Sequence, residues 1–175
     1  MYSKVYFDGR EPEVKDYLTV LKTIKLLGLK RSSRVLVYGD GTGKHTHCFR
    51  YYQVHGAEGY DPYYEEEPFG LAKGHYHDKV PSTPKGGWDL IFCYDVLEHI
   101  PLEDLGKTFR HFRNGKMVLT SICYPEMRKV YADPTHVTVK SRAWWQAMFK
   151  KHGFTEEPVP DDFPFKSQIM LWRKA

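Results

Sequence analysis

Three alternate glycines, Gly39, Gly41 and Gly43, directly follow the apolar residues 35–38. The length and branched side chains of this run favour a buried β-strand, and the residues from 44 to about 55 favour a helix. Glycines let a turn reverse sharply and bring the main chain close to a ligand. The first turn of a helix also presents N–H groups that have no partner within the helix. The motif therefore predicts either a ligand-binding loop or a tight structural turn.

Strands and helices are predicted to alternate along the rest of the chain. Short apolar runs predict strands at residues 57–60, 75–80, 88–94, 117–122 and 169–172. Apolar residues at three- and four-residue steps predict helices over 12–27, over 102–112, and between Ser141 as N-cap and Gly153 as stop. This alternation predicts an α/β fold with a doubly wound, mostly parallel Rossmann-like sheet and helices on both faces. We expect one domain over residues 1–175, with residues 1–30 as an N-terminal helical segment.

Composition limits the partners of the chain only weakly. The net charge of +4 comes from 26 basic and 22 acidic side chains spread along the sequence, so nucleic acid is neither required nor excluded. No stretch approaches the about 20 apolar residues of a membrane helix, and residues 1–4 lack the apolar run of a secretory signal. Cys48, Cys93 and Cys123 are odd in number and widely spaced, which favours free thiols in a reducing compartment. We therefore expect a cytoplasmic protein that does not bind a membrane.

An acidic residue stands where the strand after the glycine motif is expected to end. Asp61, followed by Pro62, comes about 20 residues after the glycines, the place where a nucleoside-binding Rossmann domain holds its ribose hydroxyls. The alternative is that Asp61 is a turn-former before a proline. The spacing favours a role of Asp61 in binding the ribose hydroxyls.

Three cofactors compete for the glycine motif. ATP in a P-loop would need a glycine at the position of Tyr38, and Ser or Thr at the position of His45. NAD prefers Gly-x-Gly-x-x-Gly, whereas Gly43 comes one residue early. S-adenosylmethionine is the third candidate. His45 and His47 do not suggest a metal pair, because residues two apart on a helix point to different sides.

The segment Trp88-Asp89-Leu90-Ile91-Phe92-Cys93-Tyr94-Asp95-Val96-Leu97-Glu98-His99-Ile100, together with the glycine motif and Gly59-Tyr60-Asp61, resembles class I S-adenosylmethionine-dependent methyltransferases. Members typically show an aromatic-Asp-Leu-hydrophobic strand followed by a Leu-Glu-His turn. The resemblance covers residues 34–154. It implies a set of cofactor-binding residues: Gly39, Asp40, Gly41, Gly43, Asp61, Pro62, Asp78, Tyr94 and Asp95.

Each of these residues has an implied role. The three glycines would line the methionine and ribose, Asp61 would hold the ribose diol, and Asp78 would meet the adenine amino group. Tyr94 and Asp95 would flank the cofactor. The family usually has an acid two residues before the first glycine, where this chain has Val37, and Asp40 is the nearest replacement.

Three residues are candidates for catalysis: His136, His99 and Glu98. Methyl transfer is a direct displacement, so alignment supplies most of the acceleration, and an oxygen or nitrogen acceptor also needs a base near neutral pH. Asp133-Pro134-Thr135-His136 resembles methyltransferases associated with surface-polysaccharide biosynthesis. Related enzymes that act on quinone precursors or RNA ribose bind a divalent metal through a similar turn, which implies a possible set of Asp95, Glu98, His99 and His136. Alternatively, Glu98 and His99 only brace the loop before the helix at 102–112.

The sequence therefore predicts an enzyme that uses S-adenosylmethionine to methylate an oxygen of a small molecule or saccharide. The acceptor would be held by residues 2–12, 124–140 and 158–166. A non-catalytic module that binds an adenosyl ligand or a partner, and an NAD-dependent dehydrogenase, are the alternatives.

Overall fold

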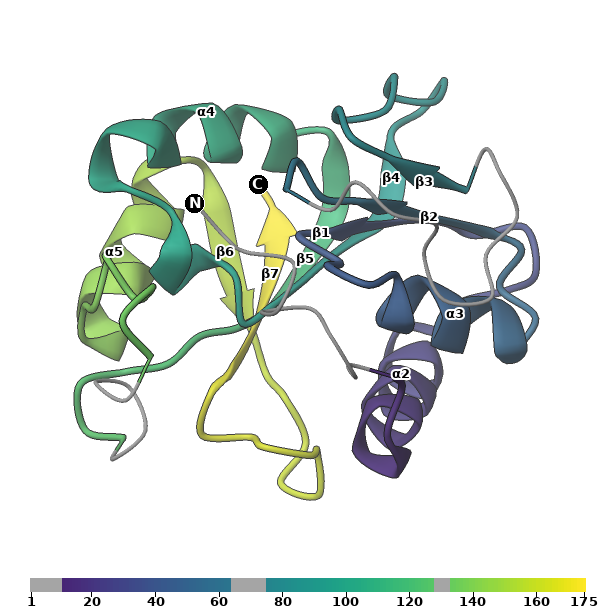
Figure 1. Ribbon diagram of the computed structural model, residues 1–175, viewed down its shortest axis with the longest axis horizontal. Helices are drawn as coiled ribbons and strands as arrows, with labels where there is room; N and C mark the ends of the chain where they lie inside the picture. The colour runs from purple at the N-terminus through teal and green to yellow at the C-terminus, as the bar shows by residue number, and fades with distance from the viewer. Residues whose placement is uncertain (1–10, 64–74, 128–132) are drawn as a thin grey trace. The chain divides into compact units, whose positions relative to one another are not determined.

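The computed structural model describes residues 11–63, 75–127 and 133–175 (Figure 1). Helices and strands alternate along these residues, as predicted, and the chain divides into two compact units, Met1–Asp89 and Leu90–Ala175. No helix in the described part is long and apolar enough to cross a membrane. All three cysteines are free thiols; Cys48 and Cys93 are buried and Cys123 is half-buried.

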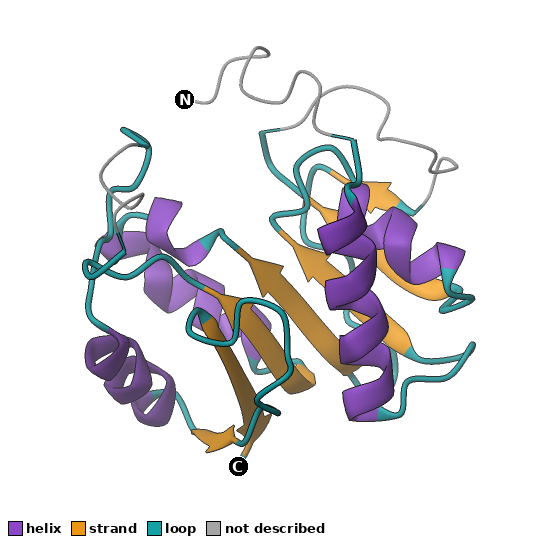
Figure 2. Ribbon diagram, turned by 90° about the horizontal axis from the view of Figure 1, so that it is seen from below, coloured by secondary structure: helices purple, strands orange, loops and turns teal. Residues whose placement is uncertain are grey.

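The described residues of the first unit form three parallel strands and two helices. β1 (Arg34–Tyr38), β2 (Gly56–Tyr60) and β3 (Tyr76–His77) lie in the order β3-β2-β1. α2 (Val14–Leu27) and α3 (Lys44–Tyr51) lie on one side of these strands, with α3 against β2 and α2 against α3 (Figure 2). The predictions of β1 and β2 are confirmed, whereas β3 is shorter than the predicted run at 75–80.

The helix after the glycine motif ends earlier than the predicted position 55, and the cause is local. Gln53 adopts a positive φ of 67°, and the N–H of Val54 donates to the carbonyl of Phe49 at 2.9 Å. This reversal buries Val54, which is 1% exposed, and leads the chain directly into β2.

The apolar stripe of α2 is not its buried face. The helix ends at Gly28 in the left-handed conformation, as predicted. Val14 and Leu18, which belong to the predicted stripe, are nevertheless 85% and 44% exposed. The buried residues of α2 are Asp16, Thr19, Val20 and Thr23, and all of them except Val20 are polar. The threonine hydroxyls donate to backbone carbonyls one turn earlier at 2.8 Å, which satisfies them inside the unit.

The described residues of the second unit form four strands in the order β4-β5-β7-β6. These are β4 (Trp88–Tyr94), which begins at the boundary between the units, β5 (Gly115–Ser121), β6 (Phe154–Glu157) and β7 (Ile169–Lys174). β7 pairs antiparallel with both β5 and β6. Strands β4, β5 and β7 were predicted, and β6 was not.

Two helices of the second unit pack through aromatic side chains. α4 (Leu102–Phe112) and α5 (Arg142–Lys151) occupy the predicted positions, and the hydroxyl of Ser141 accepts from the N–H of Trp144 as the expected cap. Phe149 stacks on Trp172 of β7 with ring centroids 4.4 Å apart and meets Phe109 of α4 edge-on at 4.8 Å. These contacts fix both helices against the strands of this unit.

Candidate functional site

The glycine loop of the first unit adopts a conformation that only glycine takes readily. Gly39, Gly41 and Gly43 have φ values of 76°, 54° and 82°, in the left-handed region that side chains with a Cβ rarely enter. The N–H groups of Gly39 and Asp40 donate to the carbonyl of Tyr60 at 2.7 and 3.0 Å, so the loop turns over the end of β2.

Asp61 holds the centre of this loop. Its carboxylate accepts from the N–H of Gly41 at 3.0 Å through one oxygen and from the N–H of Tyr63 at 2.8 Å through the other. The phenol of Tyr76 on β3 donates to the carbonyl of Gly41. Gly41 is therefore fixed from both sides, and Asp61 lies beside the glycines as the sequence led us to expect. The neighbouring Pro62 is exposed.

The carboxylate of Asp40 points into the protein. It is fully buried and accepts from the N–H groups of His45 and Thr46 at 3.1 Å each, which caps the N-terminus of α3. Because these bonds are made inside the unit, Asp40 does not offer an exposed acid in place of the one missing at Val37, which is itself 1% exposed.

A buried ion network next to the loop was not predicted. The imidazole of His45 lies between Asp16 of α2, with Nε2 and Oδ1 3.3 Å apart, and Asp40, with Nδ1 and Oδ1 3.6 Å apart. The ammonium of Lys44 lies 3.1 Å from the same oxygen of Asp16. His47, two residues on, instead meets the ring of Tyr17, so the two histidines diverge as expected.

The charges of this network shift two pKa values. Burial alone would lower the pKa of His45, but hydrogen bonds to Asp16 and Asp40 outweigh it and raise this pKa. Burial alone would raise the pKa of Asp16, but the hydrogen bond and the charge of His45 hold it well below its usual range. The imidazole of His45 thus ties α2 to the helix that leaves the glycine loop. The sequence feature that indicates this ion network is a histidine at the start of that helix.

In the second unit, the Leu-Glu-His turn is a short 3-10 helix, Leu97–His99, directly after β4. The side chain of Glu98 is fully buried, and its Oε1 accepts from the N–H of Cys123 at 2.9 Å. Its backbone carbonyl accepts from the N–H of Thr138 at 2.8 Å. Burial and the charge of Asp95 raise the pKa of Glu98 to about 8.

The loop that begins at Asp133 brings His136 to this turn. The rings of His99 and His136 meet edge-on with centroids 4.6 Å apart. Nδ1 of His99 lies 2.9 Å from the hydroxyl oxygen of Thr135. The hydroxyl and the backbone N–H of Thr135 both donate to the carboxylate of Asp133. The three candidate catalytic residues thus lie together, and Cys123, Thr135 and Asp133 join them without having been predicted.

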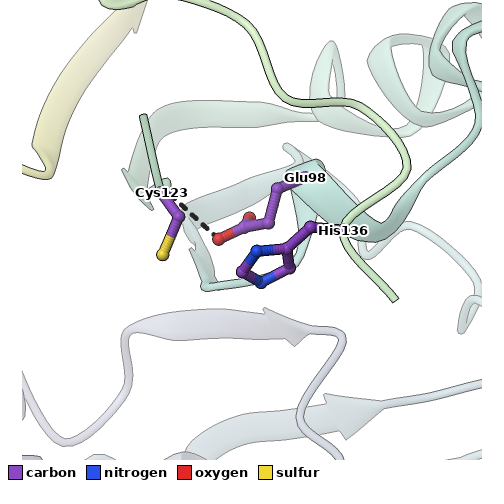
Figure 3. Close-up of side chains that lie close together, drawn as sticks. All are labelled: Glu98, Cys123 and His136. Atoms are coloured by element: carbon purple, nitrogen blue, oxygen red, sulfur yellow. Dashed lines mark hydrogen bonds between the residues drawn. The ribbon is translucent and has the colours of Figure 1, made fainter. Parts of the chain in front are cut away.

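Among the described residues, two sets of side chains place possible metal-ligand atoms within 4.8 Å of one another. One set is Glu98, Cys123 and His136 (Figure 3), and the other is His99, Asp133 and His136. The set implied by the resemblance, which included Asp95, is not among them. Asp95 instead accepts from the hydroxyl of Ser121 at 2.5 Å and has a positive φ of 53°.

The remaining predicted residues occupy the ends of strands. Asp78 is exposed and follows β3, and Tyr94, the last residue of β4, stacks on Phe92 with centroids 5.7 Å apart. Their contacts with a cofactor stay predictions. Of the segments expected to hold the acceptor, residues 2–10 and 128–132 lie outside the described residues.

Comparison with known proteins assigns the family. The methyltransferase domain family matches residues 11–158, whereas no curated protein matches the chain by sequence. Among solved structures, the chain is similar to 1,6-didemethyltoxoflavin-N1-methyltransferase of Burkholderia thailandensis, with 17% identity, a TM-score of 0.67, and coverage of 98% of this chain and 81% of that one.

Two further structures have the same fold. Magnesium protoporphyrin IX methyltransferase of Synechocystis shows 17% identity, a TM-score of 0.62, and coverage of 100% and 89%. A SAM-dependent methyltransferase of Archaeoglobus fulgidus shows 14% identity, a TM-score of 0.64, and coverage of 91% and 94%. These likenesses agree with the predicted doubly wound Rossmann-like fold. Together with the family match, they establish that the chain belongs to the methyltransferase domain family, the class I S-adenosylmethionine-dependent methyltransferases.

Proposed function

We propose that this methyltransferase acts on an oxygen of a small molecule or saccharide, and that the acceptor loses its proton at the cluster of Glu98, His99 and His136. The observation that carries this proposal is the meeting of the two imidazoles at the turn after β4, 4.6 Å apart. Imidazole is the side chain that changes its protonation near neutral pH. An oxygen acceptor needs such a base, because a hydroxyl is a weak nucleophile until its proton is lost.

The glycine loop and Asp61 suit the nucleoside end of the cofactor. S-adenosylmethionine supplies a methyl group on a sulfonium, which is displaced directly. The loop backbone is already held in its left-handed form by Asp61 and Tyr76, so little ordering is needed on binding. A carboxylate has about four acceptor positions. Asp61 can therefore keep its bond to Gly41 and still accept from ribose hydroxyls.

The related structures support a small acceptor. One is a methyltransferase with bound 1,6-didemethyltoxoflavin, and another is the mitomycin 7-O-methyltransferase. We also propose a cytoplasmic location, because the three cysteines are free thiols.

The test measures transfer of labelled methyl from S-adenosylmethionine to a panel of hydroxyl acceptors that includes saccharides and phenols. On the best acceptor, His136→Ala should lower the rate by roughly 10²–10⁴-fold while the affinity for S-adenosylhomocysteine stays unchanged. His111→Ala on α4 is the matched control and should keep the rate. Cofactor binding without turnover on any acceptor would favour the non-catalytic alternative. Turnover only on nitrogen acceptors would overturn the oxygen assignment.

A further inference from the structure

One carboxylate oxygen in the second unit is buried without a hydrogen-bond partner. Glu98 is 0% exposed, and although its Oε1 accepts from Cys123, no described donor reaches its Oε2. Leaving a buried carboxylate oxygen without a donor or cation is costly, and such atoms are rare in folded proteins. The atom therefore indicates that a group other than the described residues completes this position.

The groups around this oxygen are metal ligands. The thiol of Cys123 and the imidazole of His136 each place one ligand atom within 4.8 Å of a Glu98 oxygen and of each other. Figure 3 shows the carboxylate of Glu98 between the other two side chains. His136 is also well shielded, with its side chain 8% exposed. A carboxylate, a thiol and an imidazole thus converge at a position where Glu98 is fully buried and Cys123 is half-buried.

We propose that Glu98, Cys123 and His136 bind a divalent zinc ion. Sulfur excludes Mg²⁺ and Ca²⁺, which prefer oxygen ligands, and a thiolate with imidazole and carboxylate suits Zn²⁺. Ligand atoms around a tetrahedral zinc ion lie about 3.3–3.8 Å apart at the usual bond lengths. A contraction of at most about 1.5 Å, within the reach of side-chain rotation, would therefore close the site.

In the second set of possible ligands, His99, Asp133 and His136, two side chains have hydrogen-bond partners within the protein. Asp133 accepts from both the N–H and the hydroxyl of Thr135, and that hydroxyl also lies 2.9 Å from Nδ1 of His99. These bonds give Asp133 and His99 partners within the loop. Asp95 is likewise bonded to Ser121. The geometry therefore selects a set that includes Cys123 and omits Asp95, unlike the one implied by the resemblance.

The ion would deepen the proposed function, on which this part of the inference rests. Three protein ligands leave a fourth position open, as in catalytic zinc sites. A hydroxyl bound there becomes a stronger acid. The acceptor would then lose its proton more easily to the imidazole of His99.

Metal binding is tested without cofactor or acceptor. The purified protein is stripped with a chelator and titrated with Co²⁺, which should bind one ion per chain and give the near-ultraviolet absorption of a thiolate–cobalt bond. Cys123→Ser should abolish this band, and Cys48→Ser, a change at a buried free cysteine of the first unit, should keep it. Competition with a zinc-binding dye should show at least about 10-fold weaker zinc binding for Glu98→Gln, since loss of an outer partner alone costs 10–100-fold.

Two results would overturn the zinc site. The first is less than stoichiometric binding, or binding without a thiolate band. The second is loss of binding in Asp133→Asn and His99→Ala but not in Cys123→Ser, which would move the ion to the other set. The proposed function is tested by different outcomes from those that test the zinc site. A stoichiometric ion without methyl transfer would leave the site standing, and transfer that survives complete stripping would leave the enzyme without a catalytic role for zinc.

Discussion

Replacing His45 by alanine removes the imidazole that lies between Asp16 and Asp40 in a buried ion network, while Lys44 stays 3.1 Å from Asp16. The imidazole of His45 lies 3.3 Å from Asp16 and 3.6 Å from Asp40, and these three side chains are at most 5% exposed. Removing one partner of a buried ion pair costs about 3–5 kcal/mol, because the remaining charge stays buried. We therefore expect His45→Ala to lose about 3–5 kcal/mol of unfolding free energy, which lowers Tm by roughly 6–20 °C in a chain of this size.

The same network makes stability depend on pH in two directions. The folded-state pKa of His45 is raised, so its contribution is complete below the unfolded value of about 6.5 and is lost as pH rises through the folded value. The pKa of Asp16 is lowered, so its contribution is present above about 3.9 and is lost as pH falls through the folded value. The part of the alkaline decline caused by His45, at most about 1.4 kcal/mol per pH unit, should disappear in His45→Ala, whereas the part caused by the raised pKa of Glu98 should remain.

Urea denaturation followed by circular dichroism between pH 5 and 9.5 measures both effects. His47→Ala is the matched control, because this histidine lies on the same helix and meets the ring of Tyr17 edge-on, with centroids 6.3 Å apart. Loss of that contact should cost about 0.5–1.5 kcal/mol and leave the alkaline decline intact. A His45→Ala variant within 1 kcal/mol of the wild type, or one whose alkaline decline is as steep as that of the wild type, would refute the reasoning.

Asp61→Ala should weaken S-adenosylhomocysteine binding by about 1.5–3 kcal/mol in calorimetry; unchanged affinity in a folded variant would remove Asp61 from the ribose site. Gly41→Val should abolish that binding, because a branched side chain disfavours the φ of 54°. Circular dichroism must show that this variant folds, and normal binding would make the loop a structural turn. Trp172→Ala should cost about 3–5 kcal/mol of unfolding free energy in urea, since the side chain is fully buried against Phe149; a loss under 1 kcal/mol would contradict the packing.

Features that depend on neighbouring residues could be predicted from the sequence. The strand at 88–94 is apolar on both faces, so its bounds match those of β4. The three glycines were placed in a turn, and all three adopt positive φ values. The cap at Ser141 was also recognised from its own position before an aromatic-rich segment. Periodicity and turn conformation act over a few residues, which is why one sequence reveals them.

Features that depend on distant partners required the tertiary structure. The strand at Phe154–Glu157 has no apolar alternation and exists because it pairs with β7. The buried face of α2 is polar because Asp16 meets His45, which lies on another helix. No periodicity encodes that meeting.

In the candidate site, too, some features could be predicted from the sequence and others required the tertiary structure. Glu98, His99 and His136 were selected because their residue types and positions suit catalysis. Only the fold showed that Cys123 lies beside Glu98 and that the carboxylate of Asp40 turns inward to cap α3. A buried polar group must find a partner wherever the chain folds back on it. The sequence therefore determined which groups are present, and the tertiary structure decided which of them meet.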